Sequence, residues 1–353
     1  MPARLWRYGI HSLLQLLRQK LPISWDYMLD FILNAYTMLT ILLENVIAFR
    51  ETWLECLGDL ARYRMAVEES GDRTLWADIS RYWYNKLAEF SPEVGRVHFH
   101  LGILARPDEL LQLFYYTKAL VSICPFPNTR ESMEILFRAN EGQVLTQRTM
   151  ASAFIATHGA LFNKRPADQF TTLANNFLVL LRGEARSLGR QEVYIMLCNF
   201  AAMFQYGDKS ALFVMEFIKR KSAADADELA LNSTADLDLE LKIKKPSDPS
   251  LDLSPIASHG SSLTFHTLSV LLDHLGDPSI YPSVHVSLAF IWTLALRPPA
   301  MQKVDKFIHW ANIVRFLNNL IDSDIPFHKI EDDAFPSDDG TTRQLPEDFL
   351  IRG

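Results

Sequence analysis

The sequence predicts an all-α protein, and three observations support this prediction. Apolar residues recur at helical spacing, as in Trp6, Ile10, Leu13, Leu14 and Leu17. Glycine is scarce, at 14 of 353 residues, which argues against a turn-rich β architecture. Short proline- or glycine-containing turns separate the apolar segments at intervals that suit helical hairpins.

The N-terminal part of the chain shows six helical segments in order. The first begins near Trp6 and ends at Leu21-Pro22, because proline cannot continue a helix. The second is apolar almost all round, which is typical of a central bundle helix, and its internal polar residues argue against a membrane span. The remaining breaks are prolines or glycines. We expect the later helices over residues 26–50, 52–69, 76–90, 97–105 and 108–123.

A near-repeat indicates how these helices stack. Residues 57–62 (LGDLAR) recur as residues 101–106 (LGILAR), 44 positions later. A small residue at the second position of each copy lets two helices approach closely, as in helical-repeat proteins. The interval exceeds the roughly 34 residues of a tetratricopeptide repeat, so we expect irregular tetratricopeptide-type hairpins.

The C-terminal part has a different organisation. Helical patterns cover residues 152–162, 168–181, 191–206, 209–221, 263–275, 283–296 and 310–320. Residues 222–260 are acidic and Ser/Pro-rich, which predicts a flexible linker. We therefore divide the chain into a first domain at 1–139, a second at 140–221 plus 261–353, and the linker at 222–260.

Charge and cysteine usage limit the function classes. The formal net charge is −7, and residues 1–221 carry only a small excess of basic over acidic residues. A strongly basic nucleic-acid-binding domain is thereby excluded, and any anion binding must be local. Three scattered cysteines fit a reducing compartment and form neither a disulfide framework nor a zinc site.

Basic residues gather on the first and third predicted helices. Arg4, Arg7, His11 and Arg18 form one stripe at helical spacing. Together with Arg62 and Arg64 they would line a cationic groove if the two helices are neighbours. The alternative is a solvated face, in which Arg62 pairs with Asp59 and Arg64 with Glu68 at ordinary helical spacings.

Other polar candidates have simpler interpretations. His98 and His100 stand two residues apart on a helix and point to opposite sides, so they predict no metal site. Lys118 follows the aromatic residues 114–116 and is either a snorkelling lysine or a cation for a ligand. Residues 81–84 (RYWY) are mostly interhelical packing. Enzyme signatures such as a Walker loop or a nucleophile elbow are absent, so we expect no catalytic residue, cofactor or metal.

Several segments carry a resemblance to a known family. They are residues 5–12 (LWRYGIHS), 53–64 (WLECLGDLARYR), 114–118 (FYYTK), 125–127 (PFP) with 130–132 (RES), and 345–350 (LPEDFL). These segments resemble the fungal branch of the ever-shorter-telomeres family. That family includes telomerase-recruiting subunits and the SMG adaptors of nonsense-mediated mRNA decay.

The resemblance implies a 14-3-3-like domain with tetratricopeptide hairpins, followed by a DNA/RNA-binding-type domain of α-helical hairpins. The family's phosphoserine pocket uses an Arg-Tyr pair that matches Arg62 and Tyr63. His11 stands where relatives have a lysine, and Arg64 and Lys118 would supply the remaining positive field. Histidine is mostly neutral at pH 7, so the resemblance implies weaker, pH-dependent phosphate binding.

Two departures from the family also follow from the resemblance. The relatives' helices before Trp6 are not matched, and no nuclease domain of the PIN type is matched. We therefore expect a truncated product with one uncovered side of its N-terminal bundle.

The first functional hypothesis is a non-enzymatic adaptor that binds a phosphorylated partner, such as a decay helicase or a telomere protein, in the nucleus and cytoplasm and without a membrane. The alternative is binding of telomeric single-stranded DNA or telomerase RNA through Arg4, Arg7, Arg18 and Trp83. A third hypothesis is autoregulation, in which a phosphorylated linker serine, Ser247 or Ser254, occupies the protein's own pocket.

Overall fold

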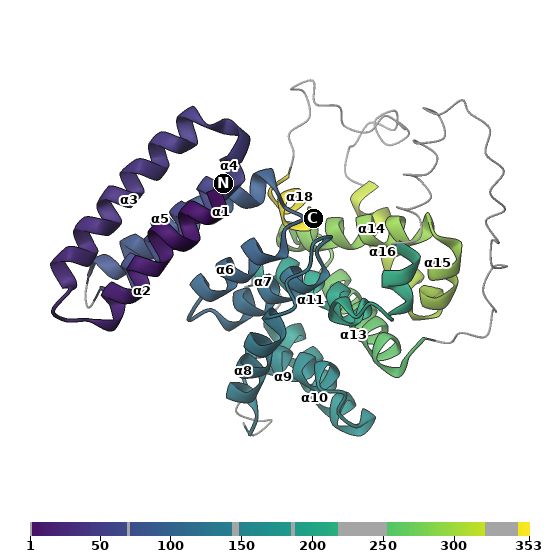
Figure 1. The fold of residues 1–353 in the computed structure, drawn as a ribbon. Helices are drawn as coiled ribbons and strands as arrows, with labels where there is room; N and C mark the ends of the chain where they lie inside the picture. The colour runs from purple at the N-terminus through teal and green to yellow at the C-terminus, as the bar shows by residue number, and fades with distance from the viewer. Residues whose placement is uncertain (1, 69–70, 143–147, 185–187, 218–252, 322–344) are drawn as a thin grey trace, which may run out of the picture. The chain divides into compact units, whose positions relative to one another are not determined.

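The computed structural model describes residues 2–68, 71–142, 148–184, 188–217, 253–321 and 345–353, and these are predominantly helical (Figure 1). The all-α prediction is confirmed, since the only β pairing within these ranges is an isolated bridge between Val94 and Cys124. The chain forms two compact units. The first comprises Met1–Asp108, Lys118–Thr129 and Arg352–Gly353, and the second Glu109–Thr117 and Arg130–Ile351.

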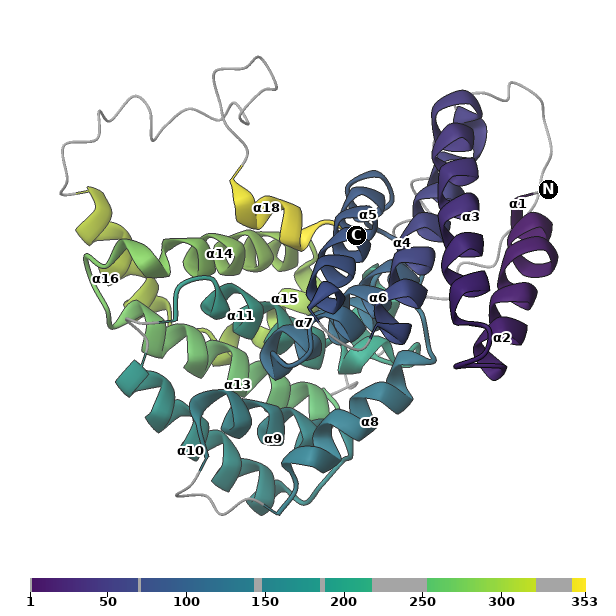
Figure 2. The same cartoon turned by 90° about the vertical axis from the view of Figure 1, so that its left-hand side faces the viewer.

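The first unit begins with one continuous helical segment of three parts. These are α1 (Pro2–Arg4), the π-helical η1 (Leu5–His11) and α2 (Ser12–Gln19). The helices that follow are α3 (Trp25–Asn45), η2 (Ile47–Phe49), α4 (Arg50–Val67), α5 (Asp72–Phe90) and α6 (Gly95–Leu104). Figure 2 shows α2 and α3 side by side. The hydrophobic core between the first segment, α3 and α4 contains Ile10, Leu14, Met28, Ile32, Leu39, Trp53, Leu57 and Leu60.

The second unit is built from helices packed around α11. These helices are α8 (Thr129–Asn140), α9 (Met150–Phe162), α10 (Ala167–Glu184), α11 (Gln191–Met203), α13 (Pro255–Leu272), α14 (Tyr281–Ala295), α15 (Pro298–Val304), α16 (Trp310–Ile321) and α18 (Pro346–Ile351). Short 3-10 turns follow at Gln205–Gly207, Pro278–Ile280 and Asp305–Phe307. The helix α7 (Glu109–Val121) runs through the sequence boundary between the two units.

Buried polar groups in the second unit pair with one another. His158 of α9 lies 2.9 Å from the Tyr206 hydroxyl through Nδ1 and 3.1 Å from Asn199 Oδ1 through Nε2. Burial lowers the pKa of His158 to about 4, so the imidazole is neutral at physiological pH. These contacts satisfy polar groups that would otherwise be costly to bury beside α11.

The prediction that the second helix lies in the centre of the bundle is wrong. The helix α3 buries Met28, Ile32, Ala35 and Leu39 along a single face. Large apolar residues on its other faces are exposed, with Leu33 at 65%. The helix packs against α2 and α4 and leaves these apolar residues uncovered, so α3 lies at the edge of the unit. By length and apolar composition alone, α3 could also span a membrane.

The structure also differs from the predicted domain limits. The helix α8, which the sequence predictions omit, joins the second unit, whereas the predicted first domain extended to residue 139. Phe137 of α8 explains this, since its ring lies 5.4 Å from that of Phe162 and packs on Gly159 of α9. The helices α15 and α18 are likewise absent from the sequence predictions.

The predicted linker is too long at its C-terminal end. The helix α13 begins at Pro255, not at residue 263, because Ser254 caps it by accepting a hydrogen bond from the Ala257 amide at 3.2 Å. Gly260, inside this helix, packs against the backbone of Ala202. Residues 222–252 of the predicted linker, including Ser247, lie outside the described residues.

The contact between α4 and α5 confirms the role assigned to the first Leu-Gly pair. A Cβ atom at Gly58 would lie 2.6 Å from Cε1 of the buried Tyr84. The Ser80 hydroxyl donates to the Gly58 carbonyl at 2.9 Å, which fixes the two helices at this distance. Only glycine allows this close approach.

We expect Gly58→Ala to lower the free energy of unfolding of the first unit by about 1–3 kcal/mol, because the added methyl group displaces the Tyr84 ring. Thermal and urea unfolding measure the effect. Gly183→Ala is the matched control, since this helical glycine of α10 has open space around it and gains helix propensity. A Gly58→Ala variant as stable as the wild type would contradict the tight contact.

A second prediction concerns Glu192 of α11, which is fully buried and accepts a hydrogen bond from the Ser283 hydroxyl at 3.3 Å. Burial raises the pKa of this carboxyl to about 7. The folded state therefore holds a proton that the unfolded state has already lost above about pH 4.3. Stability of the second unit should fall by on the order of 2–3 kcal/mol as the pH rises from about 4.5 to 7. We expect Glu192→Gln to flatten this dependence in melts at several pH values. An unchanged slope would show that Glu192 does not cause it.

Candidate functional site

The first segment and α4 meet at Tyr63. Gln15 Nε2 donates a hydrogen bond to the Tyr63 hydroxyl at 2.5 Å. The His11 ring lies edge-on to the Tyr63 ring, with centroids 6.0 Å apart, and its Nε2 is 3.5 Å from Gln15 Nε2. The first and third helices are therefore neighbours here, which is the arrangement that a shared cationic groove requires.

Two arginines from different helices, Arg62 and Arg18, lie near enough to the Tyr63 hydroxyl for their charges to influence its pKa. Burial and the charge of Asp59 raise the pKa of Tyr63, whereas the hydrogen bond from Gln15 and the charges of Arg62 and Arg18 lower it. Arg18 comes from α2 and is exposed. The hydroxyl thus lies near two arginines and one carboxylate, and it contacts the Gln15 amide and the edge of the His11 ring. We call Tyr63, Arg62, Arg18, Gln15 and His11 the Tyr63 site.

Arg62 is held by a buried network rather than presented freely. Its Nη2 donates to Asp59 Oδ1 at 2.8 Å and its Nε to the Tyr84 hydroxyl at 3.4 Å. Tyr84 in turn donates to the same Asp59 oxygen at 2.7 Å. The predicted alternative, pairing of Arg62 with Asp59, is what the structure contains. The side chain remains 30% exposed, so a ligand can still reach it by competing with Asp59.

Arg64 and Lys118 do not join this site, which corrects their predicted role. Arg64 donates to Glu68 and lies 5.7 Å from the Trp25 ring and 5.5 Å from the Trp76 ring, so packing occupies its guanidinium.

Lys118 of α7 lies on the other side of α6. Burial lowers its pKa to about 8, and its charge acts on His98. His100 stacks instead on Tyr84, next to Arg62, with centroids 5.0 Å apart. The two histidines thus have different neighbours, as their spacing predicts, and Lys118 acts on His98, whereas His100 lies beside Tyr84 and Arg62.

The arginine stripe is exposed, but Trp83 is not part of it. Arg4, Arg7 and Arg18 are solvent-accessible along α1 to α2. Trp83 of α5 donates from its indole nitrogen to the Tyr36 hydroxyl of α3 at 2.7 Å. Its ring therefore packs α5 against α3, which corrects its assignment as a base-stacking residue.

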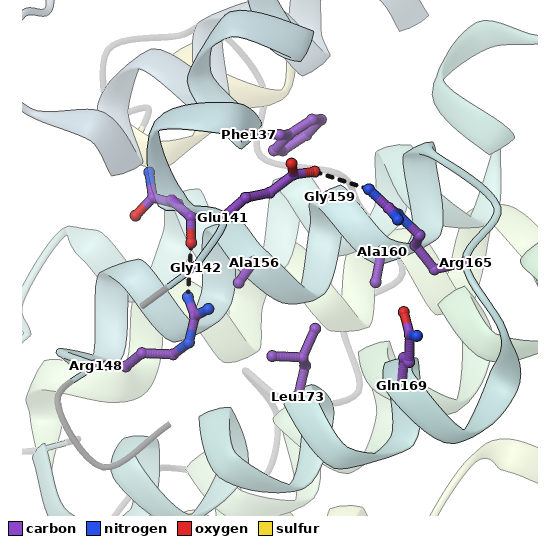
Figure 3. Close-up of a pocket in the computed structure, with 11 residues that line it drawn as sticks. Phe137, Glu141, Gly142, Arg148, Ala156, Gly159, Ala160, Arg165, Gln169 and Leu173 are labelled. Carbon is purple, nitrogen blue, oxygen red and sulfur yellow. Dashed lines mark hydrogen bonds and ion pairs between the residues drawn. The ribbon is translucent and has the colours of Figure 1, made fainter. Parts of the chain in front are cut away.

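Sequence reasoning missed a groove of about 300 Å³ formed by α8, α9 and α10. Ala156 and Ala160 form its floor, because small side chains on one face of α9 leave space above the helix, and Phe137 packs on Gly159 beside them (Figure 3). Arg148 and Arg165 lie at opposite sides of this floor (Figure 3). The only sequence signal is the small-residue spacing of α9, which is common in packed helices.

Both groove arginines have partners in the structure. Arg165 Nη2 donates to Glu141 Oε1 at 3.0 Å, and both side chains are about half exposed. Arg148 Nη1 donates to the backbone carbonyl of Asn140 at 3.2 Å. The groove therefore has a guanidinium at each side. That of Arg165 pairs with the exposed carboxylate of Glu141, and that of Arg148 donates to a backbone carbonyl.

Residues 80–184 match a family model described as the Est1 DNA/RNA binding domain. This match and the similarity to curated relatives support membership of the Est1/SMG family. This confirms the predicted membership, while the fungal branch stays a prediction. The matched residues run from α5 to α10, so they contain the whole groove, whereas the Tyr63 site precedes them.

Curated relatives agree with this Est1/SMG assignment. The chain is 31% identical over 101 residues to the Arabidopsis thaliana protein named nonsense-mediated mRNA decay factor SMG7-like, which covers 28% of this chain and 11% of the relative. It is 33% identical over 84 residues to Danio rerio telomerase-binding protein EST1A, covering 23% of this chain and 5% of the relative. Arabidopsis SMG7 is 31% identical over 86 residues, covering 24% and 8%. The similarity thus spans a small part of each relative.

Proposed function

We propose that this Est1/SMG protein is a non-catalytic adaptor that holds a phosphorylated Ser/Thr segment of a partner at the Tyr63 site. One observation carries the proposal. The helix α2 brings Gln15 and Arg18 to the edge of α4 that bears Tyr63 and Arg62. The partner is a phosphorylated protein of telomere maintenance or mRNA decay, and the adaptor works in the nucleus and cytoplasm without a cofactor.

Electrostatics explain how such a site would select phosphate. A phosphoserine is nearly dianionic at pH 7 and offers three acceptor oxygens. Arg62 is pre-oriented by Asp59 and Tyr84, so little side-chain entropy is lost when it binds. The carboxylate of Asp59 opposes the incoming charge, and the phosphate dianion outcompetes it only with help from Arg18.

Titration of a fluorescent phosphoserine peptide tests the proposal. We expect Arg62→Gln and Arg18→Gln each to weaken phosphopeptide binding by about ten- to a hundredfold, because each removes a charge-assisted hydrogen bond. Arg81→Gln is the matched control, since Arg81 forms an exposed pair with Asp78 in the same unit. The unphosphorylated peptide should bind no variant. Equal affinity of wild type and both site variants would refute the phosphate site.

The same titration with the variant His11→Lys tests whether an added cation at this position strengthens phosphopeptide binding. A lysine is a cation at pH 7 and can donate to a phosphate oxygen, so the variant should bind the phosphopeptide more tightly than the wild type. A loss of affinity would remove His11 from the proposed site.

A second candidate function is binding of telomeric single-stranded DNA or telomerase RNA. Two observations favour it, namely the match of residues 80–184 to a DNA/RNA binding domain and the exposed arginines of the stripe.

Binding to a fluorescent single strand at several salt concentrations tests this candidate. Each phosphate contact contributes about 0.7 to the salt slope for a single strand. If the stripe binds nucleic acid, Arg4→Gln and Arg7→Gln should each lower the slope by about that amount. Lys20→Gln, a nearby exposed cation outside the stripe, is the control. A slope near zero for the wild type would exclude phosphate contacts altogether.

A further inference from the structure

We propose that the groove of α8, α9 and α10 is a single-strand nucleic-acid site that admits one nucleotide between Arg148 and Arg165. The proposal rests on the second candidate function and gives it a location apart from the arginine stripe.

The shape of the groove fits one planar group and little more. Its volume of about 300 Å³ lies at the lower end of the range for small-ligand sites. Ala156 and Ala160 leave a shallow floor, and Phe137 and Leu173 form the two walls (Figure 3). A nucleobase can lie on this apolar floor, because every base has a flat apolar face whatever its sequence.

The charges of the groove suit a backbone that passes through it. A nucleotide within a strand has one phosphate on each side, and the groove has one guanidinium at each side. Guanidinium groups bind phosphate oxygens bidentately and also stack on bases. Gln169 on the rim has an exposed amide that can both donate to and accept from a base edge.

The ion pair between Arg165 and Glu141 acts as a competitor for phosphate. Both partners are about half exposed, so their pairing is weak and reversible in water. A bound phosphate takes over the Arg165 guanidinium and leaves Glu141 hydrated. This predicts that removing the carboxylate strengthens binding, an effect opposite in sign to damage of the fold.

A phosphopeptide is the other ligand class with suitable charge. The two separated cations favour a strand with regularly spaced phosphates over a segment with one phosphate. The location of the groove inside the residues that match a DNA/RNA binding domain favours the same choice.

The test measures binding of a mixed-sequence 12-nucleotide single-stranded RNA, the DNA of the same sequence, and a phosphoserine peptide to the full chain. We expect Arg165→Gln and Arg148→Gln to weaken RNA and DNA binding about tenfold and to lower the salt slope by about 0.7 each. Ala156→Leu fills the floor without changing charge and should weaken binding similarly. Glu141→Gln should strengthen it several-fold.

Arg138→Gln is the matched control, because Arg138 pairs with Glu134 on the same helix and does not line the groove. Thermal melts confirm that each variant is folded. Wild-type affinity in Arg165→Gln and Ala156→Leu, with affinity lost in Arg7→Gln, would overturn the groove and keep nucleic-acid binding. No binding of either strand by the wild type at low salt would overturn both. Loss of phosphopeptide binding alone in the groove variants would make the groove a peptide site and overturn the proposal.

Discussion

The close contact of α4 with α5 at Gly58 is the constraint on which the first unit depends. Because Gly58 has no side chain, the Tyr84 ring lies directly against α4. The Tyr84 hydroxyl then donates a hydrogen bond to Asp59, the residue after Gly58. It also accepts one from Arg62, which lies one turn further along the helix. A backbone feature thus determines where the guanidinium of the Tyr63 site points.

This positioning has an electrostatic cost. The same Asp59 that orients Arg62 also neutralises it, so the Tyr63 site is pre-organised but only weakly positive. The groove of the second unit has the same design, with Glu141 beside Arg165. In both places a carboxylate pairs with the arginine, firmly at the partly buried Asp59 and weakly at the half-exposed Glu141. Under the two binding proposals, a ligand phosphate competes with this carboxylate for the guanidinium.

Local patterns predicted most of the fold. Helical spacing located most helices, and the i, i+3 and i, i+4 rules identified the pairs Arg62–Asp59 and Arg64–Glu68 that the structure contains. Two errors arose where composition outweighed a local signal. Ser254-Pro255 is a helix start by its cap and its proline, yet it was included in a polar linker. In α8, the spacing of Met133, Leu136 and Phe137 already indicates a helix.

Other features depend on tertiary contacts that periodicity cannot reveal. Gln15 became a site residue only because α4 places Tyr63 opposite it. The apolar pattern of α3 did not specify which of its faces would be covered. The groove combines residues from three helices, and its arginines are 17 positions apart in sequence.

The uneven burial of the first unit has a dynamic consequence. The helix α4 buries nine residues, whereas α3 buries four and α2 buries Leu14 alone. Local opening should therefore begin in α2 and α3 while α4 stays folded. Arg62 belongs to the persistent half of the Tyr63 site, and Gln15 and Arg18 belong to the half that opens. The apparent affinity of the site then depends on the fraction of molecules in which α2 is docked, so any contact that covers α3 and slows its opening would strengthen ligand binding from a distance.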